Sequence, residues 1–493
     1  MVLNRFLVAV IAVTLLVSGC KKDPDPTPTS TPGTLTANAG LNQTAQVGIT
    51  VTLDGSASKD SDNKPFTYQW SIIQKPAAST VTLGNSATAR PSFVPDQAGE
   101  YAFEVTISNG QNKSSDKVTV IVTPTQAAPL SEQIRANTVL EDRIQDPAFP
   151  DYVVDKKLDV KAQLTLKPGV VIAFARDAQF NVTNDGGSLI AQGEAAKKIR
   201  LVGKEAVKGS WQGLWITSES SANVLENVEI LHGGGRDVYM AVKAGLTLSG
   251  KAQLSLKNSL VSQSDGYGLH AGDGSTLREF VANTFSNNTE SGAYVSADNV
   301  KTLDSLSVFS SNNGRNVIEV LKSNLSTKTT ETVWKGFADK TPYRILTNLG
   351  VQTGLRLNPG VVLQLSRDVS ILVDSKGYLT AVGTATRPIT FGGVEAGAGQ
   401  WRGLHFSYSA SLNNKLDYVN ISGGGSSQLV SGQKTNIAIS GSTTRFSIKN
   451  SVISQSAGYG IFTTYEARNQ LNADAATANK FENNAQGSIL IEK

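Results

Sequence analysis

The sequence predicts an all-β protein, and three observations lead to this prediction. Glycine is abundant, with 45 residues among 493, whereas methionine occurs only twice, a composition that favours strands and turns over helices. Short stretches of alternating apolar and polar residues recur up to about residue 122. Beyond them the chain repeats itself, since NSLVSQSDGYG at 258–268 returns as NSVISQSAGYG at 450–460. A chain of this length is also expected to hold more than one domain.

The charge distribution argues against a nucleic-acid partner. Only 17% of the residues are charged, and the formal net charge is +4. This small excess is spread along the chain, whereas a nucleic-acid-binding surface gathers Lys and Arg on one face. We therefore expect no nucleic-acid interface.

The N-terminus has the pattern of an export signal. Arg5 precedes an apolar run at 6–17, which is too short to span about 30 Å of hydrocarbon comfortably. The residues VSGC at 17–20 resemble a bacterial lipobox, in which the cysteine is acylated and becomes the new N-terminus. Cys20 is the only cysteine, so it has no disulfide partner. We predict that residues 1–19 are a lipoprotein signal peptide and that Cys20 is lipidated; the alternative is an incidental cysteine in an ordinary signal peptide.

Residues 20–36 comprise this cysteine and a proline-rich tether. The stretch KKDPDPTPTSTPGT at 21–34 is expected to be extended and semi-stiff, because proline fixes φ and removes hydrogen-bond donors. Lys21, where Asp would signal retention, resembles the sorting signal for the outer membrane. The expected location is the outer membrane or cell surface of a Gram-negative bacterium. Acyl chains would hold the protein there, at about 0.8 kcal/mol per buried methylene.

Residues 37–124 are predicted to form a β-sandwich. Short strands such as ITVTLDG at 49–55 follow one another with turn residues between them. YQW at 68–70 and FVPDQAGEYAFEVTISNG at 93–110 resemble a PKD-type, immunoglobulin-like module, although the WDFGDG hallmark of many such modules is missing. Trp70 is then expected to anchor the core.

Three carboxylates in this module are candidate Ca²⁺ ligands, since Ca²⁺ prefers oxygen ligands. They are Asp54, Asp60 and Asp62. No complete ligand set can be assembled from the sequence, and solvated turn carboxylates are the alternative. Ca²⁺ is the only cofactor that the sequence brings into consideration.

From about residue 130 onward the chain consists of two tandem copies of one unit. We call residues 130–322 the first copy and residues 323–493 the second copy. Corresponding segments follow the same order, and their offset drifts only from 190 to 196. A repeat of this kind determines the fold before any single motif does. The clearest pairs are Tyr152 with Tyr343, LTLKPGVVIAF at 164–174 with LRLNPGVVLQL at 355–365, Trp211 with Trp401, GGG at 233–235 with GGG at 423–425, and Phe285 with Phe481.

A shorter period lies inside the first copy. Leu260, Phe285 and Phe309 recur at steps of 25 and 24 residues, which suits one coil of three short strands. We predict that these three side chains lie in one interior file, with Val452 inward in the second copy. The polar residues expected to stack beside this file are Asn258, Asn283 and Ser307, with Asn450 in the second copy.

These features resemble the right-handed parallel β-helix, or pectin-lyase-like fold. The L-x-P-G-V segments, W-x-G-L at 211–214 and 401–404 and the GGG that follows resemble, more narrowly, a group of Bacteroidetes-like surface lipoproteins. The resemblance implies a sandwich followed by a right-handed parallel β-helix solenoid. Each coil would bury the apolar face of its neighbour, and a fully buried Leu, Val or Phe contributes about 1.5–3 kcal/mol.

The strongest catalytic candidates lie in HGGGRD at 232–237. His232, Arg236 and Asp237 could meet around a sugar acid, and glycan cleavage needs such acids and bases. The matching SGGGSS at 422–427 lacks all three. The Asp-Asp, G-H-G and R-I-K motifs of polygalacturonases are also missing. A turn built on glycine is the alternative, and we expect no catalytic residue.

Two further features persist in both copies and are candidates for ligand binding. Each copy has an Arg-Asp pair after an apolar run and a tyrosine within G-Y-G. The alternatives are a surface ion pair and packing on a neighbouring coil. The residues are Arg176, Asp177, Tyr267, Arg367, Asp368 and Tyr459.

The sequence therefore predicts a lipid-anchored surface protein without catalytic activity. Its β-helix would contact an extracellular polysaccharide or another surface. The alternative is a polysaccharide lyase or glycoside hydrolase that acts on acidic glycans, with its site in the first copy.

Overall fold

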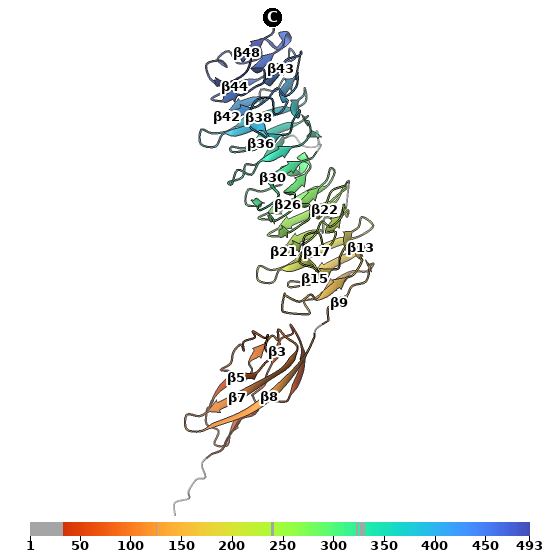
Figure 1. Ribbon diagram of the computed structural model, residues 1–493, viewed down its shortest axis with the longest axis vertical. Coiled ribbons are helices and arrows are strands. Elements are labelled where there is room, and N and C mark those ends of the chain that lie inside the picture. Colours follow the sequence, from red (N-terminus) through yellow and green to blue (C-terminus); the bar gives the residue numbers. More distant parts are fainter. Residues whose placement is uncertain (1–32, 125, 238–240, 322–323, 326–330) are drawn as a thin grey trace, which may run out of the picture. The chain divides into compact units, whose positions relative to one another are not determined.

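The computed structural model describes residues 33–124, 126–237, 241–321, 324–325 and 331–493. The predicted signal peptide, Cys20 and most of the tether lie outside these residues. The described chain forms two compact units (Figure 1). The second runs from Val122 to Lys493 and includes Ala45–Thr50 and Val94–Ala98. No helix in the described parts of the chain is long and apolar enough to cross a membrane.

The first unit is an antiparallel sandwich. A four-stranded sheet has the order β2-β8-β7-β5, and two small sheets pair β1 with β4 and β3 with β6. The strands are β1 (Leu35–Thr36), β2 (Gln43–Gln46), β3 (Val51–Thr52), β4 (Lys59–Asp60), β5 (Thr67–Gln74), β6 (Ser92–Phe93), β7 (Gly99–Ser108) and β8 (Lys113–Thr123).

Trp70 is the core anchor that the sequence predicts. Its side chain is only 2% exposed, and its indole N–H donates to the carbonyl of Thr88 at 3.1 Å. Phe93 packs between Tyr101 and Phe103, with ring centroids 5.4 and 4.6 Å away. Burial of these rings supplies much of the hydrophobic stabilisation of a unit this small.

The second unit is a parallel β-helix, in which a 14-stranded sheet runs through both copies, together with sheets of 6 and 8 strands in the first copy and of 7 and 5 strands in the second. The first-copy elements are β9 (Ala128–Pro129), β10 (Gln133–Ile134), β11 (Thr138–Leu140), β12 (Tyr152–Val154), β13 (Lys157–Val160), β14 (Gln163–Leu166), β15 (Val171–Phe174), β16 (Gln179–Val182), β17 (Ser188–Gln192), β18 (Ile199–Gly203), β19 (Leu214–Ile216), β20 (Val224–Glu226), β21 (Val228–Leu231), β22 (Ala244–Leu248), β23 (Gln253–Lys257), β24 (Leu260–Ser262), β25 (Tyr267–Ala271), β26 (Thr276–Val281), β27 (Thr284–Ser286), β28 (Ser291–Val295), α1 (Ala297–Val300), β29 (Val308–Ser311) and β30 (Arg315–Val320).

The second copy continues the same stack of coils (Figure 1). Its elements are β31 (Asn324–Leu325), β32 (Glu331–Trp334), β33 (Tyr343–Ile345), β34 (Leu349–Val351), β35 (Gly354–Leu357), β36 (Val362–Leu365), β37 (Ser370–Val373), β38 (Tyr378–Val382), β39 (Ile389–Gly393), β40 (Gly403–Ser407), β41 (Lys415–Asp417), β42 (Val419–Ser422), β43 (Thr435–Ser440), β44 (Ser447–Lys449), β45 (Val452–Ser454), β46 (Tyr459–Thr463), η1 (Tyr465–Ala467), β47 (Lys480–Glu482) and β48 (Gly487–Ile491).

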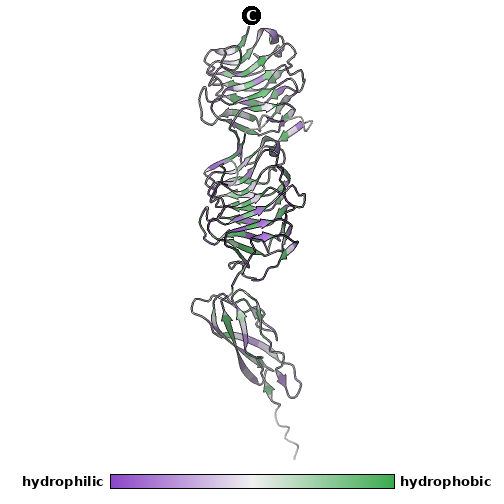
Figure 2. Ribbon diagram, turned by 90° about the vertical axis from the view of Figure 1, so that its right-hand side faces the viewer, coloured by the Kyte–Doolittle hydropathy of each residue, from purple (hydrophilic) through white to green (hydrophobic). Residues whose placement is uncertain are grey.

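The predicted all-β class, a sandwich followed by a parallel solenoid, is confirmed. Its right-handedness stays a prediction. Apolar and polar residues alternate within the stacked strands (Figure 2), as the period of two requires when one face of a strand points inward. One hydrophobic core runs from Ile134 in β10 to Ala475 near β47.

The predicted interior file exists, but it begins with Val261 and not with Leu260, so the prediction for this coil was wrong by one residue. Val261 pairs with Phe285 and is 1% exposed, whereas Leu260 pairs with Thr284 and is only half-buried. In the second copy Ile453 is buried, and Val452 is not. The rings of Phe285 and Phe309 stack at 5.1 Å.

The polar stack is displaced in the same way. The amide of Ser259 donates to Asn283 Oδ1 at 3.1 Å, and the amide of Asn283 donates to Ser307 Oγ at 2.8 Å. Asn258 is instead exposed, with φ of 49°, and its counterpart Asn450 has the same φ. A residue in this left-handed conformation turns the chain, and asparagine tolerates it better than most side chains.

The second copy is advanced by one face of the coil relative to the first. Tyr152 lies in β12, in the 8-stranded sheet, but its counterpart Tyr343 lies in β33, which pairs with β30 in the 14-stranded sheet. The strands that follow keep this shift, so β36 and β39 extend a sheet that holds β13 and β16 in the first copy. Corresponding residues of the two copies therefore do not lie on one side of the solenoid.

Candidate functional site

The HGGGRD segment holds its histidine in a buried position, apart from the other two candidate residues. His232 is 8% exposed, and burial lowers its pKa below the usual value. Its Nδ1 atom has no hydrogen-bond partner among the described residues. No hydrogen bond or ion pair within the described chain joins His232 to Arg236 or Asp237, and Asp237 is exposed.

Backbone hydrogen bonds also correct the alignment of this segment by one residue. The amide of His232 donates to the Ser262 carbonyl, and the amide of Gly423 donates to the Ser454 carbonyl, each at 3.3 Å. His232 has φ of 66° and Gly423 has φ of 79°. His232 thus corresponds to Gly423 rather than to Ser422, at a left-handed position that glycine adopts without strain.

The two Arg-Asp pairs are not internal ion pairs. Arg236 donates two hydrogen bonds to Asp177, at 3.2 and 3.1 Å, which joins two of the predicted segments. Arg176 instead pairs with Glu205. In the second copy the Ser426 hydroxyl donates to Asp368 at 2.7 Å, and Arg367 has no ion-pair partner among the described residues. These are corner contacts between coils at the surface, worth about 0–1 kcal/mol each.

Tyr267 belongs to a satisfied polar network. Its hydroxyl donates to Glu319 at 2.7 Å, and Glu319 also accepts from Arg315 at 2.6 Å. The ring stacks on Tyr294 at 4.9 Å, and burial raises the pKa of Tyr267. Tyr459, its counterpart, lies beside Gly487 in the last coil. Both rings pack on neighbouring coils, which was the alternative to glycan binding.

The three candidate Ca²⁺ ligands have separate partners. Asp54 accepts from the Ser56 hydroxyl and from Arg90, and these contacts lower the pKa of Asp54 to about 2. Asp60 accepts from Asn109 at 2.9 Å, and Asp62 pairs with a lysine at 3.1 Å. Across the described residues, no group of three or more His, Cys, Asp or Glu side chains is placed to hold a metal ion.

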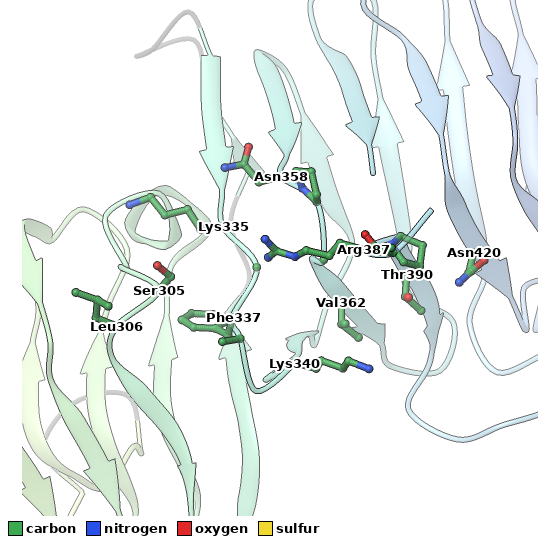
Figure 3. A pocket seen from close by; sticks show the side chains of 16 residues that line it. Ser305, Leu306, Lys335, Phe337, Lys340, Asn358, Val362, Arg387, Thr390 and Asn420 are labelled. Atoms are coloured by element: carbon green, nitrogen blue, oxygen red, sulfur yellow. The ribbon is translucent and has the colours of Figure 1, made fainter. Parts of the chain in front are cut away.

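A different feature stands out as a candidate site. A groove of about 930 Å³ lies where the second copy begins (Figure 3), and we call it the second-copy groove. Its lining includes Lys335, Lys340, Asn358, Arg387, Thr390 and Asn420. Ser305 and Leu306 of the first copy close one side.

Tight turns place the polar side chains of this groove. In the Asn358-Pro359-Gly360 turn the amide of Val361 donates to the Asn358 carbonyl at 3.2 Å, and Gly360 has φ of 87°. Proline followed by a glycine at positive φ is the signature of a type II turn. The turn before β39 is closed by reciprocal backbone bonds between Thr384 and Arg387, at 3.1 and 3.2 Å. Arg387 extends into the hollow from this turn (Figure 3).

The groove is positively charged. No Asp or Glu lines it, and no carboxylate among the described residues pairs with Arg387 or Lys340. Asp339, the neighbour of Lys340, is engaged by Ser310 and Thr341. Among the described residues, the Lys335 ammonium donates only to the Leu303 carbonyl, at 3.2 Å. The arrangement offers cations and neutral hydrogen-bonding groups, and no paired acid and base for catalysis.

Sequence reasoning did not find this groove. Its lining comes from segments between residues 305 and 420 that meet only in the solenoid. A signal was nevertheless present: Lys335, Arg387 and Asn420 replace Glu141, Lys197 and Glu229 of the first copy, so at these three positions the second copy loses two acids and gains one cation.

Comparisons with known proteins identify the first unit. Residues 39–122 match a family of PKD domains. The solution structure of the PKD domain from KIAA 1837 protein is 28% identical and covers 22% of this chain and 98% of that one, with a TM-score of 0.17. The PKD domain (329-428) of human KIAA0319 is 20% identical over 22% of this chain and 99% of that one, with a TM-score of 0.18. A PKD domain suggests a surface or adhesion-type role.

One further structure matches weakly. It is a nucleoside hydrolase-related hypothetical protein from Saccharophagus degradans that is associated with carbohydrate metabolism, 24% identical with a TM-score of 0.16. The match covers 19% of this chain and 25% of that chain, so this chain spans only a quarter of its length. No curated protein matches the chain.

Proposed function

We propose that this is a cell-surface protein, anchored through lipidated Cys20 to the outer membrane of a Gram-negative bacterium, whose β-helix binds an extracellular polysaccharide without cleaving it. The observation that carries the proposal is the second-copy groove. It combines an open hollow of about 930 Å³ with convergent polar side chains, the combination typical of a binding site for a small or extended ligand.

The chemistry of the groove suits a sugar chain. Asn358 and Asn420 each offer an amide that both donates and accepts, and Thr390 offers a hydroxyl. Sugar hydroxyls need such partners. Leu306, 71% exposed, and Pro359 add apolar surface, against which the C–H face of a sugar ring can pack.

Binding is proposed rather than cleavage because the catalytic candidates have other roles. Arg236 is held by Asp177, and His232 is buried at a left-handed corner. Glycan hydrolysis needs two carboxyl groups on either side of the bond that breaks, and the second-copy groove has none in its lining.

A screen of extracellular polysaccharides with the purified protein tests this function. We expect binding to at least one polysaccharide and no release of shorter products. Thr390→Trp should abolish the binding by filling the groove, whereas Val207→Trp, at a site that is 50% exposed in the first copy, should leave it intact. Thermal melting checks that both variants fold. Product release, or binding that survives Thr390→Trp, would contradict the proposal.

The anchor is tested separately. Mass spectrometry of the mature protein should find Cys20 as an acylated N-terminus, and Cys20→Ala should move the protein from the membrane fraction to the soluble fraction. An unmodified Cys20 would remove the anchor from the proposal without affecting the groove.

A further inference from the structure

Resting on the proposed function, we propose that the second-copy groove selects a negatively charged polysaccharide, one that carries carboxylate or sulfate groups, and that the first copy does not. Two grooves occupy the same place in the two copies, and they differ in their charged side chains.

The first copy has a smaller groove at the position equivalent to the second-copy groove. We call it the first-copy groove; its volume is about 400 Å³, and its lining includes Asp142, Gly169, Lys197, Arg200 and Glu229. The equivalence is fixed by shared backbone features. Tyr152 donates its hydroxyl to the carbonyl of Glu141, and Tyr343 donates its hydroxyl to the carbonyl of Lys335.

In the first-copy groove the cations are neutralised by its own carboxylates. Lys197 lies 3.6 Å from Asp142, and Glu229 pairs with Lys198 at 3.0 Å and with Arg200 at 3.2 Å. Because these carboxylates already satisfy the cations, an anionic ligand would have to displace them.

In the second-copy groove the same carboxylates are missing. The position of Asp142 is taken by Gly336 and that of Glu229 by Asn420, while Lys197 becomes Arg387. Lys335 stands where the first copy has Glu141, so one position reverses its charge. The cations of this groove therefore face solvent with no carboxylate of the described chain to neutralise them.

The surroundings of the equivalent turn glycines, Gly169 and Gly360, also show that a carboxylate in the first copy gives way to a cation in the second. A Cβ atom added to Gly169 would lie 2.4 Å from Asp142 Oδ2, whereas one added to Gly360 would lie 3.0 Å from Arg387 Nη2. The carboxylate that covers the turn in the first copy is thus replaced by a guanidinium in the second. A guanidinium presents its N–H groups in a planar fork that matches a carboxylate or sulfate.

The two grooves also differ in how far they are filled. In the first copy Arg200 donates to the Pro147 carbonyl at 2.7 Å, which ties the segment at 141–151 across the groove. The corresponding segment, at 335–342, is shorter, and Thr390 replaces Arg200. Without this tie the second-copy groove has more than twice the volume of the first-copy groove, about 930 against 400 Å³, which gives room for an extended ligand rather than a single small anion.

The test uses charged polymers and their neutral counterparts. The probes are dextran sulfate with dextran, and polygalacturonate with its methyl ester, titrated into the purified protein by calorimetry. We expect binding to a charged polymer only, and weaker binding as salt rises, because salt screens exposed charges. The two pairs distinguish sulfate from carboxylate recognition.

Variants locate the binding. Arg387→Ala and Lys340→Ala should each weaken it about tenfold, which corresponds to about 1.4 kcal/mol. Asn420→Glu, which restores the carboxylate of the first copy, should weaken it at least as much. Lys197→Ala is the matched control, since it removes one positive charge from the first-copy groove, and it should change the affinity less than twofold.

Each outcome of these titrations supports or overturns the proposed selection of charged polysaccharides. Equal binding of the neutral and charged polymers overturns the inference but leaves the proposed function standing. An equal loss in Lys197→Ala and Arg387→Ala overturns it too, since net charge alone would then attract the polymer. If Thr390→Trp abolishes binding of a neutral glycan only, the groove binds sugars without selecting charge. Failure of every glycan overturns both proposals.

Discussion

The two copies of the solenoid share their backbone and differ in their charge. Trp211 donates its indole N–H to the Leu231 carbonyl at 2.8 Å, and Trp401 donates to the Ser422 carbonyl at 2.7 Å. Both indoles are fully buried. By contrast, Glu229 of the first copy has no acidic counterpart in the second. The coil therefore depends on buried apolar and turn residues, so that the lining of a groove can change without disturbing the fold.

Even polar substitutions can keep a contact between coils. Trp215 donates to Ser249 Oγ at 2.8 Å, and its counterpart His405 lies 2.8 Å from Ser440 Oγ through Nε2. Two different rings thus satisfy the same hydroxyl position. The four predictions below test which differences between the copies matter.

The largest effect is expected in the interior file. Phe285 is fully buried and stacks on Phe309, so Phe285→Ala should cost about 3–5 kcal/mol of unfolding free energy, from lost burial and the cavity left behind. Phe481 holds the same position in the second copy but is only partly buried, and Phe481→Ala should cost about 1–2 kcal/mol. Chemical denaturation measures both. Equal losses would show that the two copies are packed alike at this position.

The next effect concerns acid stability. Burial lowers the pKa of His270 to about 4, from 6.5 in an unperturbed side chain. Between these values the unfolded chain takes up a proton that the folded chain does not, so stability is present above pH 6.5 and is lost as the pH falls toward 4. For one histidine this amounts to at most about 3 kcal/mol.

His270→Phe, which introduces the second-copy residue Phe462, should remove this part of the pH dependence. Denaturation at several pH values between about 4 and 7 measures it. Burial also lowers the pKa of His405 to about 4, so His405→Trp, which introduces the first-copy residue, should flatten the same window further. If His270→Phe and the parent protein lose stability in parallel, His270 does not titrate as described.

A smaller effect is expected where the copies agree. Trp211→Phe and Trp401→Phe should each cost about 1–3 kcal/mol, because each leaves a partly buried carbonyl without its indole donor and removes part of a fully buried ring. The two losses should match within about 0.5 kcal/mol because the two contacts are equivalent. They should also add in the double variant, because the two sites do not touch. Thermal melting of the single and double variants provides the comparison, and a loss in one copy alone would contradict the equivalence.

The smallest effect on stability comes from the first-copy groove. Glu229→Asn should cost about 0–1 kcal/mol, because Glu229 forms only partly exposed ion pairs. In an Arg387→Ala background the same substitution should restore part of the dextran sulfate binding, by freeing Lys198 and Arg200. Calorimetry on the two backgrounds measures this gain. If dextran sulfate binding does not increase, neutralisation of the cations by Glu229 is not the reason that the first-copy groove fails to bind the polymer.

The sequence alone determined the class of the fold, a sandwich followed by a parallel solenoid. Periodicity and turn residues predicted the sandwich with Trp70 in its core, and the duplication predicted stacked coils with Phe285 and Phe309 inside. These features are local or repetitive, so they can be read from spacing. Of the candidate site, only the exchanges at Lys335, Arg387 and Asn420 left a signal in the sequence.

Tertiary structure decided three things that spacing could not. A residue at positive φ, such as Asn258 or His232, turns the chain and shifts the expected alignment of the residues beside it by one position. In a strand, a shift of one residue exchanges the side chains that point inward with those that point outward. The pairing of β30 with β33 advances the second copy by one face, a long-range choice that no local pattern encodes. The second-copy groove follows from both, because its cations come from separate coils and lie together only after the chain has wound.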